Sequence, residues 1–289
     1  MKYKILVLDL DGTLTDSRKE ITPRTLDALL EAQRRGLRIV LASGRPVAGI
    51  EPVAERLRLA EADGYVLAYN GGQIIRWADR HPVAQTLLPP EIYPYVYAEA
   101  KSHGFEVISY ATEADGSDIL VSENPDNEYV AYEARLNRMR CRRVPHLLEA
   151  IEQPVPKLLV VGDPEPLHEF ELQLADMLMG DTGPRHHNDV WAHLHGRAGV
   201  FRSEAFFLEI VPRGVDKAKC LALLLDRLGL GREEMMACGD SYNDLTMIRY
   251  AGLGVAMANA KPEVKAVADF VTLSNDEDGV AHAVERFIL

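Results

Sequence analysis

Cysteine is scarce in this chain of 289 residues, which contains only Cys141, Cys220 and Cys238. No two of them form a C-x-x-C pair, so the sequence predicts neither a zinc cluster nor a framework of disulfides. We expect three reduced, partly buried thiols, as in cytosolic proteins.

Long apolar runs are also missing. No segment reaches the roughly 18 consecutive apolar residues that a membrane-spanning helix needs, so we expect no membrane partner. The apolar stretch within the opening residues MKYKILVLDLDG is too short for the core of a signal peptide followed by a cleavage site. The sequence therefore predicts a cytoplasmic protein.

Positive charge is in short supply, because 32 lysine and arginine residues stand against 44 acidic residues, a formal net charge of −12. Such a surface repels polyanions, so we do not expect a nucleic-acid partner. Small anionic substrates stay compatible with it, since a few local cations can outweigh the overall field. The hydrophobic share of 47% is ordinary for a globular protein of one large or two modest domains.

The chain begins with an alternation of strands and helices. The strands are continuous apolar runs, which is typical of parallel strands covered on both faces. The first helix has Thr22 as its predicted N-cap and Pro23 at its first position. Right-handed crossovers through such helices place the strands in one parallel sheet. The predicted strands cover residues 4–9, 37–45 and 64–72, and the predicted helices cover 23–36 and 46–59.

Longer segments rich in proline follow and indicate a separate α+β lobe. The first rhythm returns with a strand at 206–212 and a helix closed by Gly229. The predicted fold class is therefore α/β, a doubly wound parallel-sheet (Rossmann-like) core with an inserted α+β domain. Within the lobe we predict helices near 90–103, 126–138 and 165–178, strands at 105–109, 117–122 and 157–161, and a loop or hairpin extension at 181–199. The predicted domains are 1–82 (core, first part), 83–204 (insertion) and 205–289 (core, second part).

Two aspartates, Asp9 and Asp11, follow the first apolar strand. Residues i and i+2 of an extended chain point the same way, so both carboxylates are expected to face one side at the carboxyl end of the strand. That edge of an open α/β sheet is where ligands bind. A divalent cation that prefers oxygen ligands, such as Mg²⁺, would remove their repulsion. A pair of surface aspartates in an Asp-Gly turn is the alternative.

Three more chain positions carry polar groups at an element's end. Asp240 and Asp244 lie in GDSYND after a second apolar strand, where capping by Ser241 or Asn243 is the alternative to a metal site. Ser43 and Gly44 precede a helix start, a ready anion site. Lys217 stands at a helix start, where a cation is unfavourable unless an anion lies close by. A solvated lysine is the alternative there.

The stretches DLDGT (9–13), LASGR (41–45), Lys217 and GDSYND (239–244) together resemble the four motifs of the haloacid dehalogenase-like superfamily. The position of the insertion, between the second and third motifs, resembles the Cof-type branch, in which an inserted cap domain follows the third strand. YNGG (69–72) is similar to that branch as well. The resemblance covers the core and is weak within the cap.

This resemblance implies a mechanism. Asp9 resembles the nucleophile that forms an aspartyl-phosphate, and Asp11 resembles the general acid and base. Mg²⁺ would be held by Asp9, by Asp11 through its backbone carbonyl and by Asp240, with Asp244 orienting this set. The groups implied to hold the phosphoryl oxygens are those of Leu10, Ser43, Gly44, Lys217 and Asn243. Asn70 and Gly71 lie beside the expected hinge of the cap and are candidates to touch the substrate.

The implied activity is that of a Mg²⁺-dependent phosphatase acting on small phosphorylated metabolites, with sugar phosphates as the first candidates. A phosphomutase of the phosphomannomutase type and a dedicated sugar-phosphate phosphatase are the enzymatic alternatives. A non-catalytic metabolite-binding protein with the same fold is the alternative from another class. The sequence does not indicate the oligomeric state.

Two further sets of residues allow either a functional interpretation or a purely structural one. Arg45 is a candidate for the mouth of the site or else a solvated or ion-paired arginine. The histidines at 186, 187, 193 and 195 suggest transition-metal ligation, with His193 and His195 on one face of a strand. We favour a solvated loop, since no acidic or thiol ligands complete the set.

Overall fold

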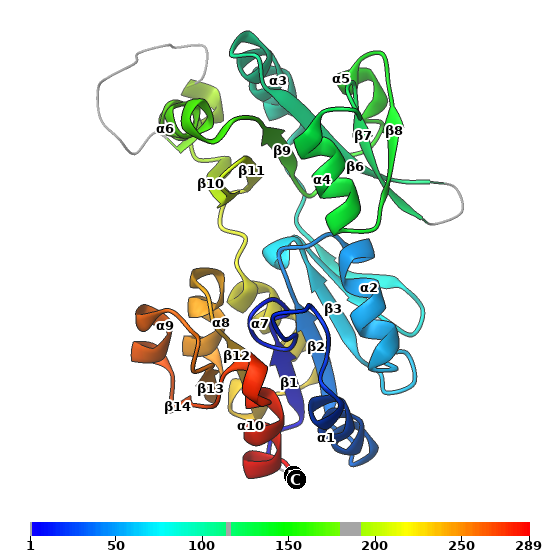
Figure 1. Cartoon of the computed structure of the whole chain (residues 1–289), viewed down its shortest axis with the longest axis vertical. Helices are drawn as coiled ribbons and strands as arrows, with labels where there is room; N and C mark the ends of the chain where they lie inside the picture. Colours follow the sequence, from blue (N-terminus) through cyan, green and yellow to red (C-terminus); the bar gives the residue numbers. More distant parts are fainter. Residues whose placement is uncertain (1, 114–116, 180–191) are drawn as a thin grey trace. The chain divides into compact units, whose positions relative to one another are not determined.

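The computed structural model describes residues 2–113, 117–179 and 192–289. They form two compact units (Figure 1), one of Met1–Gln85 with Asp216–Leu289 and the other of Thr86–Val215. The boundaries at 85/86 and 215/216 compare with predicted ones at 82/83 and 204/205. Among the described residues, no helix combines the length and the apolar character that crossing a membrane requires.

The first unit is built on an eight-stranded sheet whose central strands are buried. Six neighbouring strands are parallel, and two antiparallel strands, β4 and β5, extend one edge. The sheet order is β14 (Phe270–Val271), β13 (Leu253–Ala256), β12 (Met235–Gly239), β1 (Ile5–Leu8), β2 (Arg38–Ala42), β3 (Tyr65–Ala68), β4 (Gln73–Arg76) and β5 (His81–Gln85).

Helices join the parallel strands of this unit, as the alternating pattern predicts. Thr22 is the N-cap of the first helix, because its side chain accepts a hydrogen bond from the amide of Thr25. Gly229 closes another helix in the left-handed conformation. The helices are α1 (Pro23–Arg34), α2 (Val47–Arg56), α7 (Lys217–Leu228), α8 (Leu245–Tyr250), α9 (Pro262–Val267) and α10 (Gly279–Phe287). In Figure 1, α1 and α10 lie side by side, in agreement with their mutual contacts.

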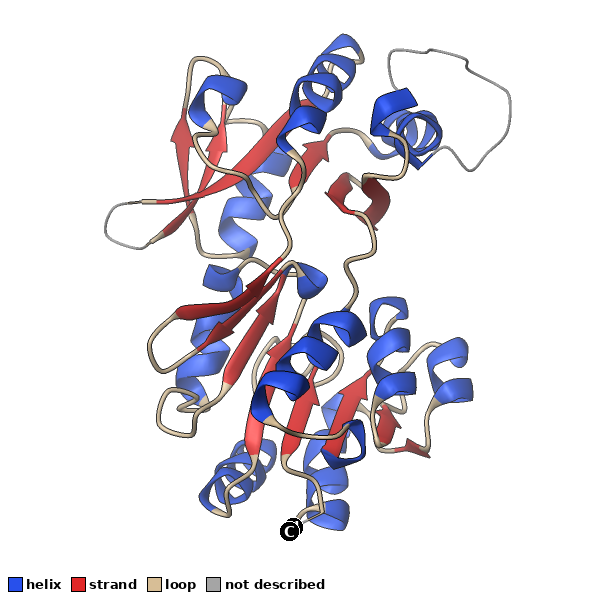
Figure 2. Ribbon diagram, turned by 180° about the vertical axis from the view of Figure 1, so that it is seen from behind, coloured by secondary structure: helices blue, strands red, loops and turns tan. Residues whose placement is uncertain are grey.

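The second unit has its own sheet and its own apolar core. Its six strands lie in the order β10 (Ala198–Glu204), β11 (Phe207–Pro212), β9 (Leu158–Val161), β6 (Glu106–Thr112), β7 (Asp118–Ser122) and β8 (Arg140–Arg143). Its helices are α3 (Tyr93–Ser102), α4 (Glu128–Leu136), α5 (Leu147–Ala150) and α6 (Pro164–Met179). Figure 2 shows helices in blue beside red strands in both units. The fold class is thus an α/β core with an inserted α+β domain, as predicted.

One predicted strand belongs to the other sheet. The segment 206–212 was expected to resume the core, but β11 pairs with β9 and β10 in the second unit. Every residue of β11 is buried, so its apolar pattern fits a strand in either sheet equally well. Which strand β11 pairs with is decided by the tertiary structure, and the local sequence pattern carries no information about it.

The segment 181–199, predicted to be a loop or hairpin extension, lies largely outside the described residues. Its described part holds a 3-10 turn at Ala192–Leu194 and the start of β10 at Ala198. His193 is in a 3-10 turn and not in a strand, so the shared strand face that the metal interpretation required for His193 and His195 is absent. The His193 ring meets Tyr95 edge-on at 5.4 Å between centroids. His186 and His187 lie outside the described residues.

Candidate active site

The site begins where β1 and β12 end side by side. The two strands run parallel in register, and the amide of Asp9 donates to the Cys238 carbonyl at 3.1 Å. Pairing of segments about 230 residues apart therefore places the carboxyl ends of both strands at one edge. Among the described residues, Asp9, Asp240 and Asp244 each bring an oxygen within 4.8 Å of the others.

Lys217 links two of these carboxylates. Its ammonium group donates to Asp9 Oδ1 at 2.7 Å, to Asp244 Oδ1 at 2.7 Å and to the Ala42 carbonyl at 2.8 Å. The lysine is 0% exposed, and a charge so deeply buried is stable only when it is paired. The unfavourable place of a cation at the start of α7 is thereby explained by two anions, as the sequence suggested.

The electrostatics of the cluster leave it short of positive charge. Burial, and next the carboxylate of Asp244, raise the pKa of Asp9 well above its usual range, although Lys217 opposes both. Burial also raises the pKa of Asp240 to about 6. Burial alone would lower the pKa of Lys217, but Asp244 and Asp9 more than reverse this effect. One ammonium thus does not fully compensate three carboxylates.

A divalent cation fits this donor set. Mg²⁺ takes oxygen ligands, usually one or two carboxylates together with substrate phosphate and water. Asp9 and Asp240 offer carboxylate oxygens at the protein side of such a site, and a bound cation would favour their ionised forms.

The turn after β1 is shaped around Asp240. Thr13 Oγ1 donates to Asp240 Oδ1 at 2.8 Å. Gly12 has φ +83°, and a Cβ there would lie 2.6 Å from Asp240 Oδ2. Only glycine therefore allows the turn to pass this close to the carboxylate.

Asp244 both caps its turn and serves the cluster. Its Oδ2 accepts from the amides of Asp240 and Ser241 at 2.9 and 3.0 Å, while its Oδ1 faces Lys217. Ser241 is the N-cap of this turn and Asp244 its third residue, so the capping alternative by Ser241 is present beside the contacts of Asp244 with the cluster. The hydrogen bond to Asp244 Oδ2 holds the backbone amide of Asp240 in place.

Asp11 takes a different direction from Asp9. Arg45 donates to it twice, from Nε to Oδ2 at 2.8 Å and from Nη2 to Oδ1 at 2.6 Å, and Lys19 Nζ donates to Oδ1 at 2.7 Å. Burial would raise the pKa of Asp11, but Arg45 and Lys19 outweigh it and lower that pKa. The extended-chain argument for parallel carboxylates does not apply, because β1 ends at Leu8 and a turn follows.

Asn70 links three other predicted phosphate and substrate groups, Ser43, Gly44 and Asn243. The backbone N–H of Asn70 donates to the Ser43 carbonyl at 2.9 Å. The side-chain oxygen of Asn70 accepts from Asn243 Nδ2 at 3.0 Å. A Cβ on Gly44 would lie 2.9 Å from the Asn70 side chain. Asn70 thus connects the ends of β2 and β12 within the first unit.

Other predicted residues have mainly local contacts. The Leu10 carbonyl accepts from the amides of Thr13 and Thr15 within the turn. Gly71 has φ +107° and lies against the start of α7, since a Cβ there would be 2.9 Å from the Asp216 carbonyl. Both residues therefore shape the backbone beside the cluster.

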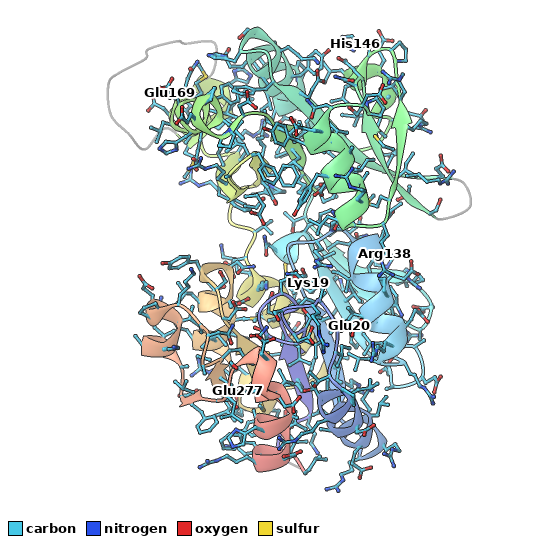
Figure 3. All side chains as sticks on the ribbon, in the orientation of Figure 1. Lys19, Glu20, Arg138, His146, Glu169 and Glu277 are labelled. Carbon is cyan, nitrogen blue, oxygen red and sulfur yellow. The ribbon has the colours of Figure 1, made fainter. Side chains whose placement is uncertain are left out.

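Two residues of this site received no role from the sequence. Thr13 lies inside the DLDGT stretch, so a hydroxyl beside the strand end was a readable signal. Lys19 follows eight residues after Asp11 in a polar turn, and Figure 3 labels it with Glu20 on the loop after β1. No periodicity or motif identifies Lys19, because its role depends on how that loop folds back.

Comparison with known proteins agrees with this fold. A family model described as haloacid dehalogenase-like hydrolase matches residues 6–284. The chain belongs to the haloacid dehalogenase-like hydrolase family, which confirms the resemblance drawn from the four motifs.

Relatives and solved structures extend along the whole chain. The protein named "Putative phosphatase YxeH" of Bacillus subtilis is 32% identical over 99% of this chain and 99% of its own. A haloacid dehalogenase-like hydrolase from Bacteroides thetaiotaomicron is 46% identical, with a TM-score of 0.88 over 99% of both chains. The HAD subclass IIB sugar phosphatase BT4131 is 25% identical, with a TM-score of 0.72 over 98% of both. The chain is accordingly a phosphatase of this family.

Proposed function

We propose that this phosphatase is Mg²⁺-dependent and hydrolyses small phosphorylated metabolites through an aspartyl-phosphate on Asp9. The observation that carries the proposal is the buried ammonium of Lys217, which bridges Asp9 and Asp244 beside Asp240 at the ends of β1 and β12. An anionic nucleophile approaches an anionic phosphate only where fixed positive charge offsets their repulsion, and Lys217 would supply part of it with a bound cation supplying the rest.

The proposed reaction has two displacements. A carboxylate oxygen of Asp9 forms a bond to phosphorus while the ester P–O bond breaks, and Asp11 gives its proton to the leaving oxygen. Asp11, now ionised, then takes a proton from water. The resulting hydroxide oxygen bonds to phosphorus, which releases inorganic phosphate and restores the Asp9 carboxylate.

The other groups hold and orient. Lys217 and Mg²⁺, when bound, would supply positive charge to the phosphoryl oxygens. Asp9, Asp240 and the Asp11 carbonyl would hold the ion, with Asp244 fixing the Asp240 backbone. Ser43, Asn243 and the amides of Leu10 and Gly44 would contact the phosphoryl oxygens.

Sugar phosphates are the first substrate class in this proposal. The support is the likeness to the solved structure of the sugar phosphatase BT4131. The second unit would act as the cap that selects the leaving group, with Asn70 and Gly71 as candidate substrate contacts. Cys141, Cys220 and Cys238 are all free thiols, which suits the proposed cytoplasmic location.

The test is a phosphate-release screen of the purified protein over phosphorylated metabolites with Mg²⁺. We expect release from one or more sugar phosphates and its loss, by at least ~1000-fold, in Asp9→Asn. The variant keeps an oxygen to accept from Lys217, so its circular dichroism should match the wild type. The matched control is Asp27→Asn, the same substitution at an exposed position of α1.

Three results would redirect the proposal. Unchanged release by Asp9→Asn would remove the nucleophile assignment. Metabolite binding without any phosphate release from the wild type would favour a non-catalytic binding protein. A requirement for a bisphosphate, with no free phosphate formed, would identify a phosphomutase.

A further inference from the structure

We propose that Lys19 is a positioning residue which, together with Arg45, fixes the Asp11 carboxylate for proton transfer to the leaving oxygen. The inference rests on the proposed function, in which Asp11 is the acid and base. Lys19 belongs to none of the motifs that identify the family in this chain.

The first observation is the number of charged donors on one carboxylate. Arg45 binds both oxygens of Asp11 from one side, and Lys19 Nζ binds Oδ1 at 2.7 Å. A bidentate arginine holds a carboxylate in a defined plane. A third donor at Oδ1 leaves the carboxylate little freedom to rotate within that plane.

The second observation is that the loop carrying Lys19 is built to present it. Lys19 has φ +64°, a left-handed conformation that costs a residue with a side chain roughly 1–2 kcal/mol. Asp16 holds this loop closed: its Oδ1 accepts from the amides of Arg18 and Glu20, and its amide donates to the Glu20 carbonyl. Such a conformation persists only where the surroundings determine it.

The third observation is that the Lys19 contact has little value for stability. The Lys19 side chain is 58% exposed and that of Asp11 35%, and exposed ion pairs contribute at most about 1 kcal/mol. The left-handed backbone costs a similar amount. The benefit of the arrangement therefore lies in the direction it gives to Asp11.

That direction matters because Asp11 lies close enough to Asp240 for the two carboxylates to repel each other. Without the fixed cations its side chain could adopt several rotamers. Proton transfer requires the carboxyl group within hydrogen-bond reach of the leaving oxygen, so a misdirected Asp11 slows the step without weakening substrate binding. Lys19 and Arg45 hold it apart from the cluster.

The test compares leaving groups. Alkyl phosphates need a proton on the leaving oxygen, whereas p-nitrophenyl phosphate has a leaving group that departs as the anion. For Lys19→Met we expect kcat to fall about 10-fold on the best sugar phosphate and less than about 3-fold on p-nitrophenyl phosphate, with KM nearly unchanged. Lys19→Arg should restore most of the loss. Arg18→Met, which alters the same loop without touching Asp11, should behave as the wild type.

Three outcomes would overturn the inference: equal losses on both substrates, a rise in KM alone, or no change in Lys19→Met. The second would indicate that Lys19 binds the phosphate itself. A ligand-free crystal structure of Lys19→Met tests the inference apart from activity, since the Asp11 carboxylate should leave its present position or occupy more than one. A wild type that releases no phosphate would refute the proposed function, and this crystal structure would still decide whether Lys19 positions Asp11.

Discussion

Gly12 is the residue on which the shape of the cluster depends most directly. Its φ of +83° and the 2.6 Å that a Cβ would leave to Asp240 Oδ2 act together. We expect Gly12→Ala to displace Asp240 and to lower phosphatase activity on the order of 100-fold. The free energy of unfolding should also fall by roughly 1–2 kcal/mol from the backbone alone. Steady-state kinetics and urea unfolding measure the two effects.

Gly36 offers a control for this prediction. It has φ +92° but a Cβ there would meet nothing within 4 Å. Gly36→Ala should therefore show the same loss of stability and keep full activity. If the two variants lose activity alike, the backbone penalty and not the contact with Asp240 would be the cause.

Asp11 needs a different protonation state in each of the two proposed displacements. Its neighbours Arg45 and Lys19 lower its pKa, which favours the ionised form needed in the second displacement. The first displacement needs the protonated form. Contact with a phosphorylated substrate, whose negative charge repels the Asp11 carboxylate, supplies a physical reason for the pKa of Asp11 to rise at that moment.

At the scale of elements, Thr22 joins two helices. It caps α1 by accepting from the Thr25 amide, and its hydroxyl donates to Asp278, which precedes α10. We expect Thr22→Ala to lower the free energy of unfolding by about 1–2 kcal/mol with unchanged turnover, as measured by urea unfolding and phosphate release. Thr22→Ser keeps the hydroxyl and should be close to the wild type; an equal loss there would assign the effect to the methyl group.

Elements with one dominant local signal were predictable from the sequence. The N-cap Thr22, the closing Gly229 and the buried runs of β1 and β12 follow from side-chain chemistry and periodicity. β8 was not predicted, because its sequence RCRR carries no apolar alternation. Its strand geometry comes from pairing with β7, so a neighbour decides it.

At the scale of the whole molecule, metal binding should couple to stability. A cation that binds the folded cluster and not the unfolded chain stabilises by about 2.7 kcal/mol at a concentration 100-fold above its Kd. We expect Mg²⁺ to raise the melting temperature of the wild type by several degrees and Asp240→Asn to abolish the shift. Calorimetry or fluorescence-monitored melting measures it.

Chelation gives the matching result for activity. Excess chelator should stop phosphate release, and added Mg²⁺ should restore it. Full activity in chelator, or a melting temperature that ignores Mg²⁺, would remove the ion from the proposal. The family membership and the phosphatase class would stand, because they do not depend on which cation is bound.

The sequence by itself determined where strands and helices alternate, and it determined that carboxylates, a serine and a lysine stand at their ends. These features depend on neighbours a few residues apart. Only the tertiary structure decided that β12 lies beside β1, that β11 joins the second sheet and that Asp11 turns to Lys19 and Arg45. Each of these depends on which distant backbone or charge completes a hydrogen bond, and local periodicity carries no information about that partner.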